Sequence, residues 1–182
     1  MLLANLLDAR AIVHESRILS REQVYQELVE RICRYHNLPI CGSALLNMIL
    51  ERDQEASTAY PTGIAIPHIR MENYHDTVVG MAFLQTPLDY DGTKGHWVCL
   101  IIADKSSSNL YLNLVAALLR MSKDASIVQT LASQHDGFGV VQYINKQEIQ
   151  LKKEITISDV MISEPVTISQ NALLAELSTL LC

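Results

Sequence analysis

A short segment near the middle of the chain places a histidine where it could act as a nucleophile. Ile64 and Ile66 are β-branched and predict a short buried strand that Gly63 opens. Pro67 has no N–H to donate to a sheet ladder, so we expect strand pairing to stop there. His68 would then lie at the end of a strand and the start of a loop, within reach of another macromolecule. Its imidazole is neutral often enough near pH 7 to attack an electrophile.

The residues around this histidine form a longer motif. Ser57-Thr58 is followed by four residues of turn, then by Gly63-Ile-Ala-Ile-Pro-His68, with Arg70 two positions further on. This pattern resembles the active-site segment of enzyme IIA of the phosphoenolpyruvate-dependent phosphotransferase system, of the fructose/mannitol/nitrogen-regulatory type (EIIA type 2). The resemblance covers about residues 1–150. It implies that His68 accepts a phosphoryl group from an HPr-like phosphocarrier protein or a nitrogen-pathway equivalent, without a metal or other cofactor.

The same resemblance suggests which side chains receive the phosphoryl oxygens. Arg52, just before the Ser-Thr turn, could pair two of them in a fork, although it could equally be a cation at the end of its own helix. Ser57 and Thr58 offer hydroxyl and backbone N–H donors, with ordinary turn chemistry as the alternative. Arg70 is a second candidate cation, or a solvated one.

One position departs from the family pattern. The family has a second histidine before a leucine-rich helix, facing the phosphorylated one, and that position aligns with Asn109. An amide can still donate a hydrogen bond to a phosphoryl oxygen, but it does not titrate and adds no positive charge. We therefore take His68, Arg52 and Asn109 as the catalytic candidates.

Composition narrows the class of protein. The chain has 182 residues, of which 49% are apolar and 19% charged, a profile typical of a globular fold. Its formal charge of −6, without a basic stripe, argues against nucleic-acid binding. The longest apolar run is too short to span a bilayer, so we expect a cytoplasmic protein. No Cys-x-x-Cys pair occurs, which favours free thiols at Cys33, Cys41, Cys99 and Cys182.

Helical and strand patterns alternate along the chain. A capping box at Ser20 predicts a helix that continues to about His36. Trp97–Ala103 is continuously apolar, typical of a strand covered on both faces. The other expected elements are a strand at 11–14, a helix from residue 43, a strand at 77–84 that ends at Pro87, a helix after the serines 106–108, a helix at 125–133, and a segment at 140–147 after a break at Gly137 and Gly139. This order predicts an α/β fold, a three-layer α/β/α sandwich with a mixed sheet of about five strands.

The last thirty residues differ from the rest. Residues 151–182 contain Asp-Val-Met, a short spacer, Pro-Val-Thr-Ile and a helical pattern, which resembles the opening of a CBS domain. We therefore expect a phosphotransferase domain at 1–150 and an incomplete CBS domain at 151–182. The leading hypothesis is a phosphohistidine carrier in a regulatory role, with a downstream IIB or regulatory protein as partner and a homodimer as one assembly. The alternative is a non-catalytic interaction module with a degenerate enzyme IIA fold, coupled to a nucleotide-sensing CBS domain.

Overall fold

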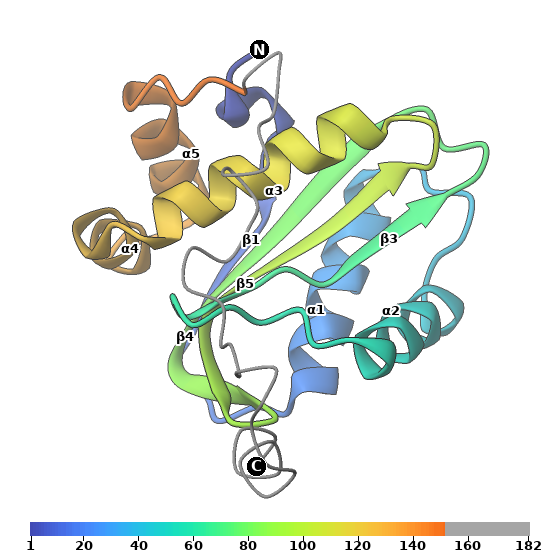
Figure 1. Cartoon of the computed structure of the whole chain (residues 1–182), viewed down its shortest axis with the longest axis horizontal. Helices are drawn as coiled ribbons and strands as arrows, with labels where there is room; N and C mark the ends of the chain where they lie inside the picture. The colour runs from blue at the N-terminus through green and yellow to red at the C-terminus, as the bar shows by residue number, and fades with distance from the viewer. Residues whose placement is uncertain (152–182) are drawn as a thin grey trace, which may run out of the picture.

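A mixed five-stranded sheet forms the centre of the computed structural model, which describes residues 1–151 (Figure 1). The strands are β1 (Leu7–Glu15), β2 (Ile64–Ala65), β3 (His68–Met71), β4 (Thr77–Tyr90) and β5 (Thr93–Asp104). Their order is β1-β4-β5-β2, and β3 also pairs with β5. β4 and β5 form an antiparallel hairpin, whereas the β1–β4, β2–β5 and β3–β5 pairs are parallel.

Helices cover both faces of this sheet. They are the 3-10 helix η1 (Leu3–Leu6), α1 (Arg21–Tyr35), α2 (Ser43–Glu55), α3 (Ser108–Ser122), α4 (Ala125–Ala132) and α5 (Gly137–Lys146). Figure 1 shows α3 crossing in front of the sheet and α1 behind it. The α/β/α sandwich with a mixed five-stranded sheet is therefore confirmed. The expected start of a CBS domain lies outside the described residues.

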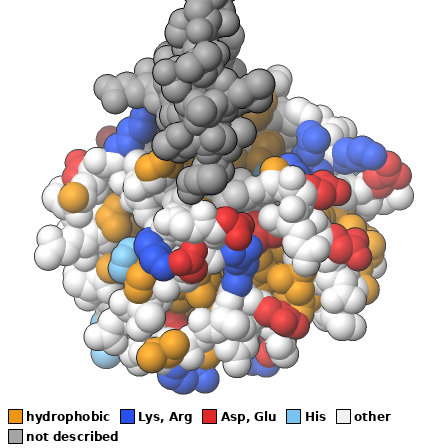
Figure 2. Space-filling view, turned by 60° about the horizontal axis from the view of Figure 1, so that its bottom comes forward, with side chains coloured by type: hydrophobic (Ala, Val, Ile, Leu, Met, Phe, Trp, Pro, Cys, Tyr) orange, Lys and Arg blue, Asp and Glu red, His pale blue; other side chains and the backbone are white. Residues whose placement is uncertain are grey.

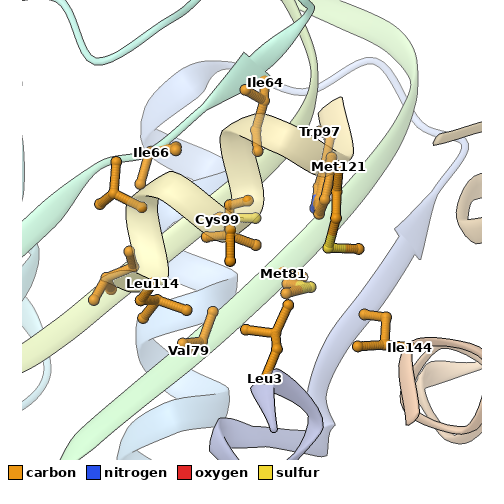
Figure 3. Close-up of a cluster of buried hydrophobic side chains, with 14 of the residues drawn as sticks. Leu3, Ile64, Ile66, Val79, Met81, Trp97, Cys99, Leu114, Met121 and Ile144 are labelled. Carbon is orange, nitrogen blue, oxygen red and sulfur yellow. The ribbon is translucent and has the colours of Figure 1, made fainter. Parts of the chain in front are cut away.

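Two hydrophobic clusters hold the layers together. The first packs α3 and α5 against one face of the sheet through residues such as Leu114 and Ile144, as Figure 3 shows. The second packs α1 and α2 against the other face through residues such as Leu28 and Ile49. β5 contributes alternate residues to both clusters, which confirms that this strand is buried on its two faces.

The sheet continues past Pro67, contrary to the sequence prediction. Pro67 lacks an N–H, but its carbonyl accepts a hydrogen bond from the Ile101 N–H at 2.9 Å. Pairing with β5 resumes directly afterwards, with His68 opposite Ile101 in parallel register. His68 is therefore the first residue of an edge strand and not the start of a loop. A missing donor interrupts one rung of the ladder without ending it.

Two other element boundaries differ from the prediction. β4 runs through Pro87 to Tyr90, with a shift in its pairing register between Phe83 and Leu88 that accommodates the proline. Gly137 begins α5 instead of preceding it, because the Asp136 side chain caps this helix. A Cβ atom at Gly137 would lie 2.0 Å from the Ala9 carbonyl oxygen, so only glycine allows this close approach of helix and strand.

The cysteines only partly follow the prediction of free thiols. Cys33, in α1, and Cys41, just before α2, form a disulfide with their Cα atoms 5.8 Å apart. The turn between the two helices brings them together, which the spacing of eight residues did not indicate. Cys99 is a buried free thiol whose pKa is raised by burial. Cys182 lies outside the described residues.

The surface does not concentrate one kind of charge on the face shown in Figure 2, where basic and acidic side chains are interspersed. Oppositely charged side chains also form pairs within the described residues, such as the exposed Lys105 with Glu72 and Arg10 with the partly buried Asp8. Across residues 1–151, no helix combines the length and the apolar character needed to cross a membrane.

Candidate functional site

His68 begins the edge strand β3, with its ring half-buried. The Nδ1 atom lies 3.1 Å from the carbonyl oxygen of Ile66, two residues earlier. A carbonyl can only accept, so this contact is a hydrogen bond from Nδ1–H. In the neutral ring, Nε2 therefore carries the lone pair. The backbone just before β3 thus selects the nitrogen that can act as a nucleophile.

The surroundings of His68 favour its neutral form. Burial is the main cause that lowers the pKa of His68, and the positive charges of Arg52 and Arg70 lower it further. The hydrogen bond to Ile66 and the negative charge of Asp53 act in the opposite direction, and the net shift is downward. At pH 7 the ring is therefore mainly unprotonated, as a nucleophile requires.

A buried carboxylate supports the turn that precedes β2. Asp53 accepts hydrogen bonds from the Thr58 hydroxyl at 2.6 Å and from the Tyr25 hydroxyl at 3.0 Å. It also forms an ion pair with the partly exposed Arg21, with the Arg21 nitrogen 3.1 Å from the carboxylate oxygen. The Thr58 carbonyl in turn accepts from the Ile66 N–H at 2.9 Å. A continuous series of hydrogen bonds thus connects Asp53, through Thr58 and Ile66, to the ring of His68.

The sequence analysis missed Asp53, although it stands next to Arg52. The position of Asp53 about one turn before the Ser-Thr pair was a signal for this contact. A carboxylate near the end of a helix can accept a hydrogen bond from a hydroxyl a few residues further along the chain. The predicted role of Thr58 changes accordingly. Its hydroxyl is buried and donates to Asp53, so it supports the turn instead of facing an incoming phosphoryl group. Ser57 is exposed, and its hydroxyl accepts from the Ala59 N–H in ordinary turn geometry.

The two predicted arginines both lie in the neighbourhood of His68. Arg52, in the last turn of α2, is partly exposed, and its guanidinium nitrogen lies 3.6 Å from a carboxylate oxygen of Glu55. Arg70, two residues along β3, donates to the Ser108 hydroxyl at the start of α3 at 3.3 Å. Both positive charges act on the His68 ring, so α2 and β3 each supply a cation to one site.

The α3 residue in ring contact with His68 is Tyr111 and not Asn109. The centroids of the His68 and Tyr111 rings lie 5.0 Å apart, and the planes are tilted by 41°. Asn109 is exposed. Its backbone carbonyl accepts a hydrogen bond from the side-chain amide of Asn113. Two residues along a helix correspond to about 200° of rotation, so these side chains leave α3 on different sides.

The helical spacing of the buried residues on α3 was the signal that could have identified Tyr111. Leu114 and Leu118 follow it at three and seven residues and are fully buried. Among residues 1–151, no group of three His, Cys, Asp or Glu side chains is arranged to hold a metal ion. The site thus combines a neutral imidazole, two guanidinium groups and a phenol, a set suited to receiving an anionic group on nitrogen.

Comparison with known proteins gives the same family throughout. The family model described as "Phosphoenolpyruvate-dependent sugar phosphotransferase system, EIIA 2" matches residues 5–147. The chain is 25% identical over 142 residues to the nitrogen regulatory protein of Bradyrhizobium diazoefficiens, covering 75% of this chain and 90% of that protein. It is 24% identical over 151 residues to the fructose-specific EIIABC component of Bacillus subtilis, covering 81% of this chain and 24% of that protein.

Solved structures share the fold. The nitrogen regulatory protein IIA-Ntr from Neisseria meningitidis superposes with a TM-score of 0.63 at 16% identity, covering 78% of this chain and 98% of that one. IIA mannitol from Escherichia coli superposes with a TM-score of 0.59 at 18% identity, covering 76% and 98%. Because the family match extends over most of the chain, this protein belongs to the EIIA type 2 family of the phosphoenolpyruvate-dependent sugar phosphotransferase system.

Proposed function

We propose that this protein is a phosphohistidine carrier in which Nε2 of His68 accepts and then releases a phosphoryl group. The observation that carries this proposal is the hydrogen bond from Nδ1 of His68 to the Ile66 carbonyl, which leaves Nε2 unprotonated. Members of the family act as phosphotransferase intermediates. The phosphocarrier unit would span residues 1–150, and an HPr-like protein would be the phosphoryl donor.

The transfer needs no acid or base from this chain. The Nε2 lone pair attacks phosphorus in line as the P–N bond of the donor's phosphohistidine breaks. The donor's ring leaves as neutral imidazole with the electron pair of that bond. The His68 ring, which keeps its proton on Nδ1, takes the positive charge that the donor's ring loses. No proton has to move between the partners, and the Ile66 carbonyl can hold the charged ring in place.

The neighbouring cations would receive the phosphoryl oxygens. Charge spreads over the three equatorial oxygens in such a transfer, so preorganised donors lower the barrier. We assign this role to Arg52 and Arg70, whose charges already act on the His68 ring. Ser57, exposed in the turn before β2, and Asn109, at the start of α3, are further candidate donors from the sequence.

Phosphorylation by a reconstituted donor system tests the proposal. The protein is incubated with phosphoenolpyruvate, enzyme I and HPr or its nitrogen-pathway equivalent, and its intact mass is measured. We expect one added phosphoryl group, and none in His68→Ala. His96→Ala, which removes an exposed histidine elsewhere, is the matched control and should still be labelled. No added mass in the unaltered protein, or labelling that survives in His68→Ala, would refute the proposal.

A regulatory output is the second candidate, and the names of two relatives support it. Relatives named nitrogen regulatory protein occur in Bradyrhizobium diazoefficiens and Pseudomonas aeruginosa, at 25% and 24% identity. In this role the phosphoryl group on His68 would alter a protein contact instead of continuing to a IIB acceptor. A complex of a mannitol IIA with a phosphorylated IIB is known from Escherichia coli. Whether phosphorylation changes the set of bound proteins separates the two outcomes.

A further inference from the structure

We propose that the Tyr111 hydroxyl on α3 donates a hydrogen bond to the phosphoryl group carried by His68. The inference rests on the proposed phosphocarrier function and deepens it. It assigns to a tyrosine the place opposite the nucleophile that the sequence had assigned to Asn109. The buried stripe that continues through Leu114 and Leu118 puts Tyr111 on the packed side of α3, and the packed fold brings the Tyr111 and His68 rings together.

The contacts of Tyr111 place it between the nucleophile and a cation. Its ring lies 5.0 Å from the His68 ring, and the guanidinium carbon of Arg70 lies 6.0 Å from its centroid. Arg70 is also tied to α3 through the Ser108 hydroxyl. Tyr111 is half-buried, so its ring is partly held by packing and partly open to solvent. The start of β3 and the first turn of α3 are therefore joined by a ring contact at His68 and a hydrogen bond at Arg70.

The electrostatics place the phenol oxygen in the field that acts on His68. The charges of Arg70 and Arg52 influence both the Tyr111 phenol and the His68 imidazole. Burial, assisted by the nearby Tyr60, nevertheless raises the pKa of Tyr111 to about 12. The phenol thus keeps its proton at every physiological pH. It can donate to a phosphoryl oxygen without adding a negative charge to the site.

A tyrosine in this position differs chemically from a second histidine. A phenol with a pKa of about 12 supplies one neutral donor that does not change with pH between 5 and 9. A histidine would change its charge within that interval. Tyr111 should therefore add no titration of its own to the pH dependence of phosphorylation.

A chemical phosphoryl donor tests the role of Tyr111 without depending on the identity of the protein partner. Phosphoramidate is added, its P–N bond breaks as the bond to His68 Nε2 forms, and ammonia leaves. The signal of phosphohistidine is followed by ³¹P NMR. We expect Tyr111→Phe, which keeps the ring and removes the hydroxyl, to be phosphorylated about tenfold more slowly, the effect of one hydrogen bond to a charged group.

Tyr35→Phe is the matched control. Tyr35 also lies beneath an arginine, with the Arg10 guanidinium carbon 4.4 Å from its ring centroid, but it belongs to α1. Its loss of a hydroxyl should leave the phosphorylation rate unchanged. Thermal unfolding of each variant verifies that the fold is intact, and Tyr111→His, which restores a donor, should recover most of the rate.

The outcomes separate the two proposals. Equal rates for Tyr111→Phe and the unaltered protein, with His68 phosphorylated in both, would overturn the assignment of Tyr111 and leave the phosphocarrier function standing. A slow Asn109→Ala beside a normal Tyr111→Phe would return the role to Asn109. Absence of phosphorylation from both phosphoramidate and the protein donor would remove the phosphocarrier function and the role of Tyr111 together. A slow Tyr111→Phe beside a normal Tyr35→Phe supports the inference.

Discussion

At the scale of single residues, the site depends on the protonation state of one imidazole. His68 is held by Ile66 through Nδ1, and its pKa is lowered by burial and by two arginines. Both effects leave Nε2 free to attack at neutral pH. In the proposed transfer, the residue would be prepared before any partner arrives, which would reduce the reorganisation that the reaction requires.

The pH dependence of phosphorylation follows from this environment. Because the folded pKa lies below the usual value of 6.5, the phosphorylation rate should be constant above that pH and fall as pH decreases through the folded pKa. The free energy of unfolding changes with pH in the same direction as the phosphorylation rate. The unfolded chain binds the proton first, so the contribution of His68 to the free energy of unfolding is present above pH 6.5 and is lost as pH falls through the folded pKa.

NMR titration of the ring measures this pKa directly. Arg70→Gln should raise it, since a positive charge that opposes protonation is removed. Arg17→Gln, an exposed arginine paired with Glu15 on another part of the surface, is the control and should leave the titration unchanged. A midpoint above 6.5 in the unaltered protein would contradict the proposed environment.

At the scale of the elements, α2 and the turn before β2 act together on the site. The end of α2 supplies Asp53, whose carboxylate is buried and accepts from Thr58, Tyr25 and Arg21. Thr58 then fixes Ile66, which orients His68. The end of α2 is therefore linked through hydrogen bonds to the proposed nucleophile, although Asp53 makes no hydrogen bond to the His68 ring.

Replacement of Asp53 by Asn tests this support. The amide keeps the shape of the side chain but turns a donor toward groups that also donate. It removes the carboxylate that pairs with Arg21, which keeps its hydrogen bond to the Asp89 carbonyl. Arg21 is partly exposed, so we expect a loss of about 2 kcal/mol in the free energy of unfolding, less than for a fully buried pair. Phosphorylation of His68 should also be slower at a temperature where the variant is folded.

Chemical denaturation and the phosphorylation rate measure the two effects separately. Glu72→Gln removes an exposed carboxylate that pairs with Lys105, and it should leave both quantities unchanged. An Asp53→Asn variant as stable and as rapidly phosphorylated as the unaltered protein would show that the hydrogen bonds through Thr58 do not position His68.

At the scale of the whole molecule, the site is a locally positive region on an acidic protein. The chain carries a formal charge of −6, yet two arginines act on His68. A phosphoryl group carries about −1.5 to −2 charges at pH 7, by analogy with other phosphorylated residues, while the His68 ring gains one positive charge, so the net change offsets part of this local excess. Phosphorylation would therefore change the charge that a partner meets at this surface.

A regulatory role predicts that phosphorylation changes protein binding. Partners whose acidic surfaces bind near Arg52 and Arg70 of the unphosphorylated protein should be released after phosphorylation. The His68→Ala variant should retain these partners with and without the phosphoryl donor. Quantitative mass spectrometry of the captured proteins, at low and high salt, measures the difference. Identical sets of partners for the phosphorylated and unphosphorylated protein would exclude a switch at His68 and leave the carrier role.

Local sequence patterns predict the order of the main elements and single out His68 as the candidate nucleophile. Capping residues such as Ser20, the apolar run in β5 and the Ala-Ile-Pro-His motif depend on neighbours close in the chain, and such local signals are readable without coordinates. The resemblance carried by that motif gave the family, which the comparison with known proteins confirms.

Tertiary structure alone decided which distant side chains meet. The contact of Tyr111 with His68 and the disulfide between Cys33 and Cys41 depend on the phase of each helix against the sheet and on the path of the turns. Asp53 became visible as a support only once α2 lay beside the turn before β2. The rotation of a helix about its own axis is fixed only when its apolar stripe is buried against the sheet. The sequence contains the stripe but not the packed layers that bury it.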